Sequence, residues 1–81
     1  MSVLLGEAEL REQLMRANEQ FRRLAAEHKI YAEQLEKLTS RAYLTEDEKL
    51  QEITLKKKKL MLKDQMYSMV QKCRRELEGQ P

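Results

Sequence analysis

The sequence predicts an all-α fold in which two long helices form an antiparallel helical hairpin, resembling a coiled coil, that self-associates into a helical bundle. Three observations favour this fold. Apolar residues of the first half recur at alternating steps of four and three, apolar residues of the second half fall on two sides of a helix, and the 81 residues include only two glycines and one proline. Charged residues make up 37% and hydrophobic residues 41% of the chain, a composition typical of amphipathic helices rather than of sheets.

The first helix is expected over about residues 7–38, within a single domain that spans residues 1–81. No glycine or proline interrupts this range, and the acids Glu7, Glu9 and Glu12 lie where a helix N-terminus favours negative charge. Its apolar seam has the heptad spacing by which a helix turns one narrow stripe toward a partner helix. The seam residues are Leu10, Leu14, Ala17, Phe21, Leu24, His28, Tyr31, Leu35 and Leu38.

A loop over residues 39–45 is expected to reverse the chain before a second helix over about residues 46–78. Thr45 and Glu48 match a capping box, in which each side chain accepts a hydrogen bond from the backbone amide of the other residue. Gly79 and Pro81 favour a helix end. A short loop between helices of equal length makes them antiparallel neighbours. Because residues 39–44 contain no glycine or proline, an extended trimer or a parallel coiled coil with a straightened loop is the alternative.

The second helix has apolar residues on two sides. One stripe, which includes Lys59 as its polar member, suits the seam of the first helix; its apolar members are Leu55, Leu62, Met66, Met69, Cys73 and Leu77. The opposite side has Leu50, Ile53, Leu60, Met61 and Tyr67. A two-helix hairpin cannot cover both sides, so we expect a homo-oligomer, most simply a two-fold dimer that forms a four-helix bundle. Lys63 and Asp64 flank the ridge made by Leu60 and Tyr67 and are assigned to the same self-association surface, because flanking charges select orientation in helix pairs.

A run of four lysines, Lys56, Lys57, Lys58 and Lys59, with Lys63 close behind, is the only concentrated charge in the chain. Consecutive helical positions form a collar rather than a stripe. We expect Lys59 to lay its aliphatic stem along the seam, while the others are solvated or pair with acids on a neighbouring helix. The alternative is weak, sequence-independent nucleic-acid binding through Lys56 to Lys59 and Lys63, with Arg74 and Arg75 as further candidates.

No catalytic, cofactor-binding or metal-binding residue is predicted, and we do not expect an enzyme. If the turn is centred near residue 42, His28 faces Lys56, while Cys73 faces Leu10 or Arg11. Cys73 is then roughly 25 Å from Lys56, and so from His28, along the helix axis. The single histidine and the single cysteine therefore cannot form a nucleophile and base pair or share a metal ion. Cys73 is interpreted as a small buried apolar side chain, and His28 as a packed, hydrogen-bonded one.

Charge and hydropathy favour a cytoplasmic protein without membrane contact. Sixteen basic residues against fourteen acidic residues give a formal net charge of +2, which is too balanced to predict binding to nucleic acid or to an anionic membrane. The longest apolar run, Val3 to Leu5, is far too short for a signal peptide or a membrane span. A small self-associating protein of this kind is expected to act as a scaffold or adaptor for another protein, whose identity the sequence does not give.

The segment LKKKKLMLKD, from Leu55 to Asp64, resembles the YdcH-like family of small bacterial proteins. Residues that match the family pattern are Phe21, Leu24 and His28 in the first helix, and Lys59, Leu60, Leu62, Lys63, Asp64 and Met66 in the second. The resemblance covers roughly Asn18 to Val70. It implies a cytosolic helical hairpin in a bacterial cell, and it supplies neither a biochemical activity nor a catalytic residue.

Overall fold

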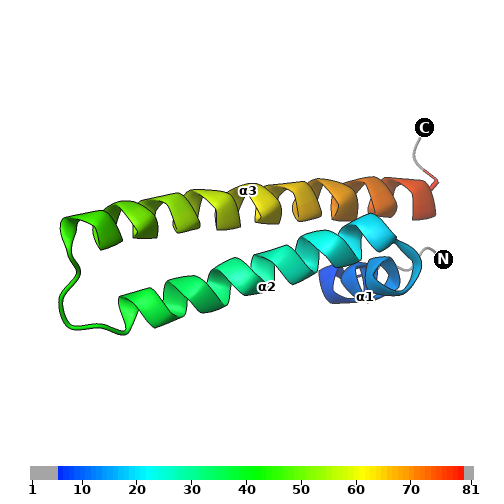
Figure 1. Cartoon of the computed structure of the whole chain (residues 1–81). Coiled ribbons are helices and arrows are strands. Elements are labelled where there is room, and N and C mark those ends of the chain that lie inside the picture. The colour runs from blue at the N-terminus through cyan, green and yellow to red at the C-terminus, as the bar shows by residue number, and fades with distance from the viewer. Residues whose placement is uncertain (1–5, 80–81) are drawn as a thin grey trace.

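The structure, a computed structural model, describes residues 6–79 and contains three helices and no strand within that range. Helix α1 spans Glu7–Ala17, α2 spans Glu19–Thr39 and α3 spans Glu46–Leu77. Helices α2 and α3 lie side by side and run in opposite directions, joined by a loop at one end of the pair (Figure 1). Helix α1 lies against the opposite end of the pair. None of the described helices combines the length and the apolar character required to cross a membrane.

The start of α3 is the element that local sequence determines most strictly. The Thr45 side chain accepts a hydrogen bond from the Glu48 amide at 3.1 Å, and the Glu48 carboxylate accepts one from the Thr45 amide at 2.9 Å. The predicted capping box is therefore confirmed. At the other end α3 stops at Leu77, followed by Gly79 at φ 70°, a left-handed conformation that glycine adopts without steric cost. Pro81 lies outside the described residues.

The prediction of one uninterrupted helix over residues 7–38 is wrong, because the chain bends at Asn18. Asn18 has an extended backbone (φ −123°, ψ 112°), ends α1 and caps α2. Its Oδ1 accepts a hydrogen bond from the Phe21 amide at 2.9 Å. The Arg22 guanidinium donates to the carbonyl oxygens of Met15 and Arg16 at 2.9 and 3.0 Å. Side chains thus satisfy backbone groups that a break in a helix leaves without partners.

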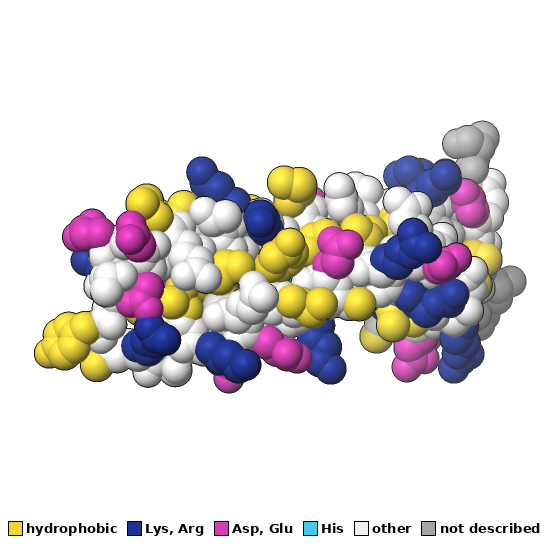
Figure 2. Space-filling view, viewed as in Figure 1, with side chains coloured by type: hydrophobic (Ala, Val, Ile, Leu, Met, Phe, Trp, Pro, Cys, Tyr) yellow, Lys and Arg dark blue, Asp and Glu magenta, His cyan; other side chains and the backbone are white. Residues whose placement is uncertain are grey.

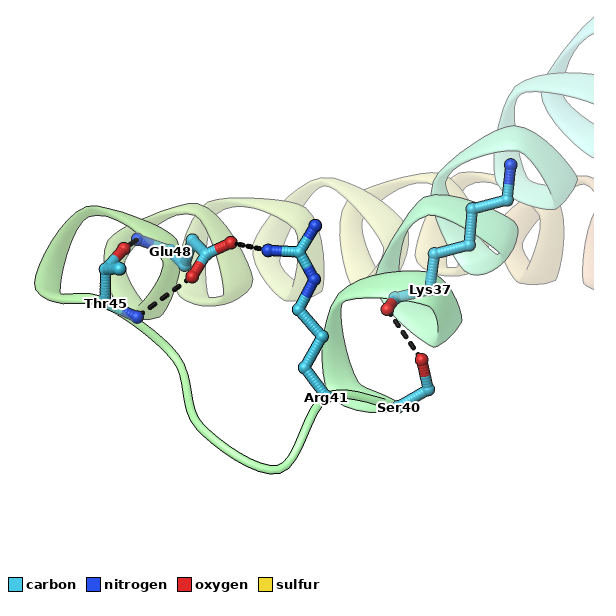
Figure 3. A network of polar contacts seen from close by, with 5 residues as sticks. All are labelled: Lys37, Ser40, Arg41, Thr45 and Glu48. Atoms are coloured by element: carbon cyan, nitrogen blue, oxygen red, sulfur yellow. Dashed lines mark hydrogen bonds and ion pairs between the residues drawn. The ribbon is translucent and has the colours of Figure 1, made fainter.

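Polar contacts hold the segment between α2 and α3 at both of its ends (Figure 3). The Ser40 hydroxyl donates to the Lys37 carbonyl oxygen at 2.8 Å, which closes the last turn of α2. The Arg41 guanidinium forms an ion pair with Glu48, the residue that also caps Thr45. One carboxylate therefore ties the segment to the first turn of α3.

The core lies where all three helices meet, at the bent end of the molecule. Its fully or almost fully buried residues are Leu10 and Leu14 of α1, Phe21 of α2, and Met66 and Val70 of α3. The remaining buried residues are Leu38, Leu55 and Leu62. The bend in the chain brings α1 back onto this cluster, which explains why Leu10 is 0% exposed in so short a helix.

Two predicted seam residues are exposed. Ala17 lies at the bend, where α1 leaves the line of α2, and Leu77 lies in the last turn of α3, where its side chain is 48% exposed. Both exposures have the same physical reason: α1 folds back toward the core instead of continuing alongside the end of α3. The other predicted seam residues are buried or half-buried.

Candidate functional site

The second apolar side of α3 is the candidate functional site, and we refer to it as the α3 outer face. It consists of Leu50, Ile53, Leu60, Met61 and Tyr67. Their exposed fractions lie between 49% for Ile53 and 63% for Leu50. Hydrophobic side chains of this size are usually withdrawn from water, so a group of five along one helix is typical of an interaction surface.

The position of the α3 outer face follows from the packing of α3 against α1 and α2. Leu55, Leu62, Met66 and Val70 are buried on one side of α3. At about 100° per residue, the five exposed residues project from the opposite side. Figure 2 shows hydrophobic side chains both along the line between α2 and α3 and standing out from α3 itself, among charged side chains of both signs. The helix therefore buries one apolar side and leaves the other in solvent.

Two opposite charges flank the ridge that Leu60 and Tyr67 form on the α3 outer face. Lys63 and Asp64 are both exposed and lie between Leu60 and Tyr67 in the sequence. On the helix, Lys63 projects to one side of the ridge formed by these two residues and Asp64 to the other. A partner helix that covered the ridge would meet a positive charge along one edge and a negative charge along the other.

The lysines of the run Lys56 to Lys59 have separate environments. Lys56 forms an ion pair at 3.8 Å with Glu52 of the same helix, rather than with an acid of a neighbouring helix, and the Nζ atom of Lys58 lies 5.5 Å from the centroid of the Tyr31 ring. Cation–π contact and ion pairing both occupy charge that would otherwise face a ligand. Lys59 is half-buried along the seam and Lys57 is exposed, as a collar around a helix requires.

Three basic side chains nevertheless line one groove between α2 and α3, with a volume of about 300 Å³. The lining residues are Leu35, Lys56, Lys59, Leu60 and Lys63. The spacing of the lysines, three and then four residues apart, places them on one side of α3. We refer to this feature as the basic groove.

His28 lies among cations from both other helices. Burial lowers the pKa of His28 below its ordinary value of 6.5, and the positive charges of Lys59, Lys63 and Arg11 lower it further. The Nε2 atom is shielded from solvent and has no hydrogen-bond partner among the described residues. The predicted cationic environment is present, although the cations that act on the imidazole are Lys59, Lys63 and Arg11 rather than Lys56. His28 is therefore packed as predicted, but its Nε2 atom does not make the predicted hydrogen bond to any described residue.

Cys73 is half-buried beside the bend and lines a cavity of about 240 Å³ together with Leu14, Asn18 and Met69. Lys72 and Glu76 line the same cavity. Within residues 6–79, histidine, cysteine and acidic side chains form no group of three or more that could hold a metal ion.

Two residues of structural importance were missed by the sequence analysis. Val70 is 0% exposed, and its position about 60° from the centre of the buried stripe could have identified it. Arg11 acts on His28 only because α1 folds back, so periodicity along one straight helix gives no indication of this contact. Tyr31, predicted as a seam residue, is half-buried and also provides the ring beneath Lys58.

The comparison with known families agrees with the segment that forms the α2–α3 pair. The family model described as "Protein of unknown function (DUF465)" matches residues 21–70. This segment includes α2 from Phe21 onward, the connection to α3 and most of α3, but not α1. No curated protein and no solved structure matches the chain.

Proposed function

Since the chain belongs to the YdcH-like family of proteins of unknown function (DUF465), we propose a function from its own surface: a self-associating helical hairpin that acts as a scaffold or adaptor. The observation that carries this proposal is the α3 outer face, with five large apolar side chains between 49% and 63% exposed. Covering each of them is worth roughly 1.5 to 3 kcal/mol at full burial. A second copy of the same face provides a matching apolar surface.

In the proposed dimer, the α3 helices of two copies cross antiparallel near residues 60–64, and each α2 lies outside them. The two copies then form a four-helix bundle in which Lys63 of one copy meets Asp64 of the other across the two-fold axis. Because Lys63 and Asp64 each occur once in every copy, the Lys63 of each copy would find its partner in the Asp64 of the other. The exposure of Lys63 and Asp64 leaves them free to make these contacts.

In such a dimer, the surface outside the α3 outer face would be present twice, once on each copy. An adaptor built this way brings two partner molecules together, and the second binding event becomes effectively intramolecular. The proposed role is non-enzymatic and cytoplasmic, in keeping with the family resemblance. Its partner is a protein that binds outside the α3 outer face.

Substitution of Leu60 tests the self-association. Leu60→Glu places a charge in the proposed interface of both copies, and we expect the dimer dissociation constant in sedimentation equilibrium to rise about 100-fold or more. Gln65→Glu is the matched control, because it adds the same charge at an exposed α3 position outside the α3 outer face. A native chain that stays a folded monomer at high concentration, or equal effects of the two substitutions, would refute the proposal.

Nucleic-acid binding is a second candidate function, favoured by the basic groove. Lys56, Lys59 and Lys63 line it together, and their spacing would allow contact with successive phosphates of a backbone. The apolar lining by Leu35 and Leu60 gives no means of reading bases. The expected binding is therefore weak and independent of sequence.

Salt dependence tests this second function. If the three lysines each contact a phosphate, affinity for a mixed-sequence duplex should fall roughly 40-fold between about 50 and 200 mM salt, because bound counterions are released. The triple substitution Lys56→Gln, Lys59→Gln and Lys63→Gln should abolish binding. The control with the same loss of charge is Lys29→Gln, Lys37→Gln and Lys49→Gln, at exposed positions. Absence of binding at low salt would eliminate the candidate.

A further inference from the structure

Helix α1 is joined to the rest of the molecule through a single residue. Asn18 is the only residue between α1 and α2, and it holds the bend with its side chain on the Phe21 amide. The Arg22 guanidinium adds two hydrogen bonds to carbonyl oxygens at the end of α1. These side-chain contacts replace the backbone hydrogen bonds that one continuous helix would make across the bend.

The sequence around the bend is compatible with a straight helix. Leu14, Ala17, Phe21 and Leu24 continue the heptad steps across Asn18, and no glycine or proline lies between residues 7 and 38. In the bent chain, Ala17 loses its place on the seam and is exposed. Straightening would return Ala17 to the same stripe as Leu14 and Phe21. The bend and the straight helix are therefore both encoded in this segment.

Helix α1 covers an apolar surface of the α2–α3 pair. Leu10 and Leu14 pack in one cluster with Phe21, Met66 and Val70, and the cluster leaves Phe21 1% and Val70 0% exposed. Phe21, Met66 and Val70 lie inside the family-matched residues 21–70, whereas α1 lies outside them. The α2–α3 pair thus provides a receptor surface, and α1 is a separate piece of chain that occupies it.

We propose that α1 is an exchangeable arm, which straightens at Asn18 and docks on Phe21, Met66 and Val70 of a second copy while receiving the second copy's arm in return. A hinge of one residue between helices favours such exchange, because the open form regains helical hydrogen bonds at the hinge and every arm contact is remade between copies. The two straightened helices, residues 7–39 of each copy, would lie antiparallel with the two-fold axis near Asn18. This association is distinct from the α3 outer face and does not depend on it.

The arm of a second copy is identical to the arm that occupies this position within one chain. Arg11 forms an ion pair with Glu7 of the same arm at 3.5 Å, and in the docked position its positive charge acts on His28, as do the charges of Lys59 and Lys63. The arm of an identical chain brings the same Glu7 and Arg11 pair, so its base arrives with its own acid beside it. Its two leucines, one turn apart, match the apolar cluster residue for residue because they are the same residues that occupy it within one chain.

Asn18→Ala tests the exchange in a Leu60→Glu background, in which the proposed contact through the α3 outer face is removed. Alanine deletes the Oδ1 cap and favours a continuous helix, so we expect the monomer–dimer equilibrium to shift toward the dimer about tenfold or more. Gln13→Ala, at an exposed position within α1, is the control and should leave the equilibrium unchanged. Arg22→Gln, which removes the two hydrogen bonds to Met15 and Arg16, should act in the same direction as Asn18→Ala.

Isotope-filtered NOE spectra of mixed labelled and unlabelled chains identify the dimer that forms. Contacts between the methyl groups of Leu10 or Leu14 and the ring of Phe21 should appear between chains. A straight monomer, a dimer in which these contacts stay within one chain, or variants at both Asn18 and Arg22 that remain monomeric would overturn the proposal. If Leu60→Glu has no effect on the native chain but Asn18→Ala still exchanges arms, only the function proposed for the α3 outer face fails.

Discussion

His28 is held between cations from two other helices, so its protonation opposes the folded structure. Burial lowers its pKa most, and the charges of Lys59 and Lys63 on α3 and of Arg11 on α1 lower it further. The pKa of His28 is therefore lower in the folded chain than in the unfolded chain, where it is close to 6.5. Between these two pKa values the unfolded chain binds more protons. The contribution of uncharged His28 to the free energy of unfolding is therefore complete above about pH 6.5, and it is lost as the pH is lowered below this value.

We predict that the free energy of unfolding in urea decreases between about pH 7.5 and pH 5.5. The decrease should be smaller in His28→Gln, which cannot take up a proton. Glu48 has a lowered pKa, mainly because its carboxylate accepts a hydrogen bond from the Thr45 amide, so its contribution to stability is complete above its ordinary pKa of 4.5 and is lost only below that value. It therefore does not disturb this range. An equal decrease in the native chain and in His28→Gln would show that other groups cause it.

Helical periodicity along the sequence was sufficient to predict which side chains of α3 are buried and which are exposed. Leu55, Leu62 and Met66 are buried as predicted, and Leu50 and Tyr67 are exposed on the opposite side. Each of these positions is determined by helical geometry alone. The environment of His28 could not be predicted in the same way, because Arg11 reaches it only after α1 has folded back.

At the scale of elements, α3 was predictable and the division of the first helix was not. The start of α3 depends on Thr45 and Glu48, three residues apart, which make the capping box wherever the helix lies. The bend at Asn18 instead depends on Leu10 and Leu14 packing against Met66 and Val70, from the other end of the chain. Asparagine is a good N-cap, and this was the one local indication of a break in an otherwise uninterrupted helical pattern.

The capping box should have a measurable effect on stability. Thr45→Ala removes the oxygen that accepts the Glu48 amide, and we expect the free energy of unfolding to fall by about 1 kcal/mol. Thr54→Ala, in the interior of α3, is the matched control. The Thr54 hydroxyl donates to the Leu50 carbonyl oxygen of the same helix, and alanine has a higher helix propensity, so this change should be neutral or slightly stabilising. Equal loss in both variants, measured by urea unfolding, would contradict a capping role.

At the scale of the whole molecule, the chain buries apolar residues most completely at its bent end and least along the middle of α3. Three helices meet at the bent end, where Phe21 is 1% exposed, whereas α3 alone carries the α3 outer face. A small chain with one limited core commonly depends on association for further stability. The proposed bundle would bury the exposed α3 outer face. The proposed arm exchange would instead replace α1, which covers the core at the bent end, with the α1 of a second copy.

The orientation of the proposed bundle can be tested through its charges. Lys63→Asp would place two acids opposite each other at two symmetric positions, and we expect the dimer dissociation constant to rise about 10- to 100-fold. The exchange Lys63→Asp with Asp64→Lys restores opposite charges across an antiparallel crossing, so its dissociation constant should return close to the native value. Lys29→Asp changes net charge equally at an exposed position of α2 and should have little effect. Because these charges are exposed, the differences should shrink at high salt. A double variant that dimerises no better than Lys63→Asp in sedimentation equilibrium would exclude a contact between Lys63 of one copy and Asp64 of the other, and with it the proposed crossing near residues 60–64.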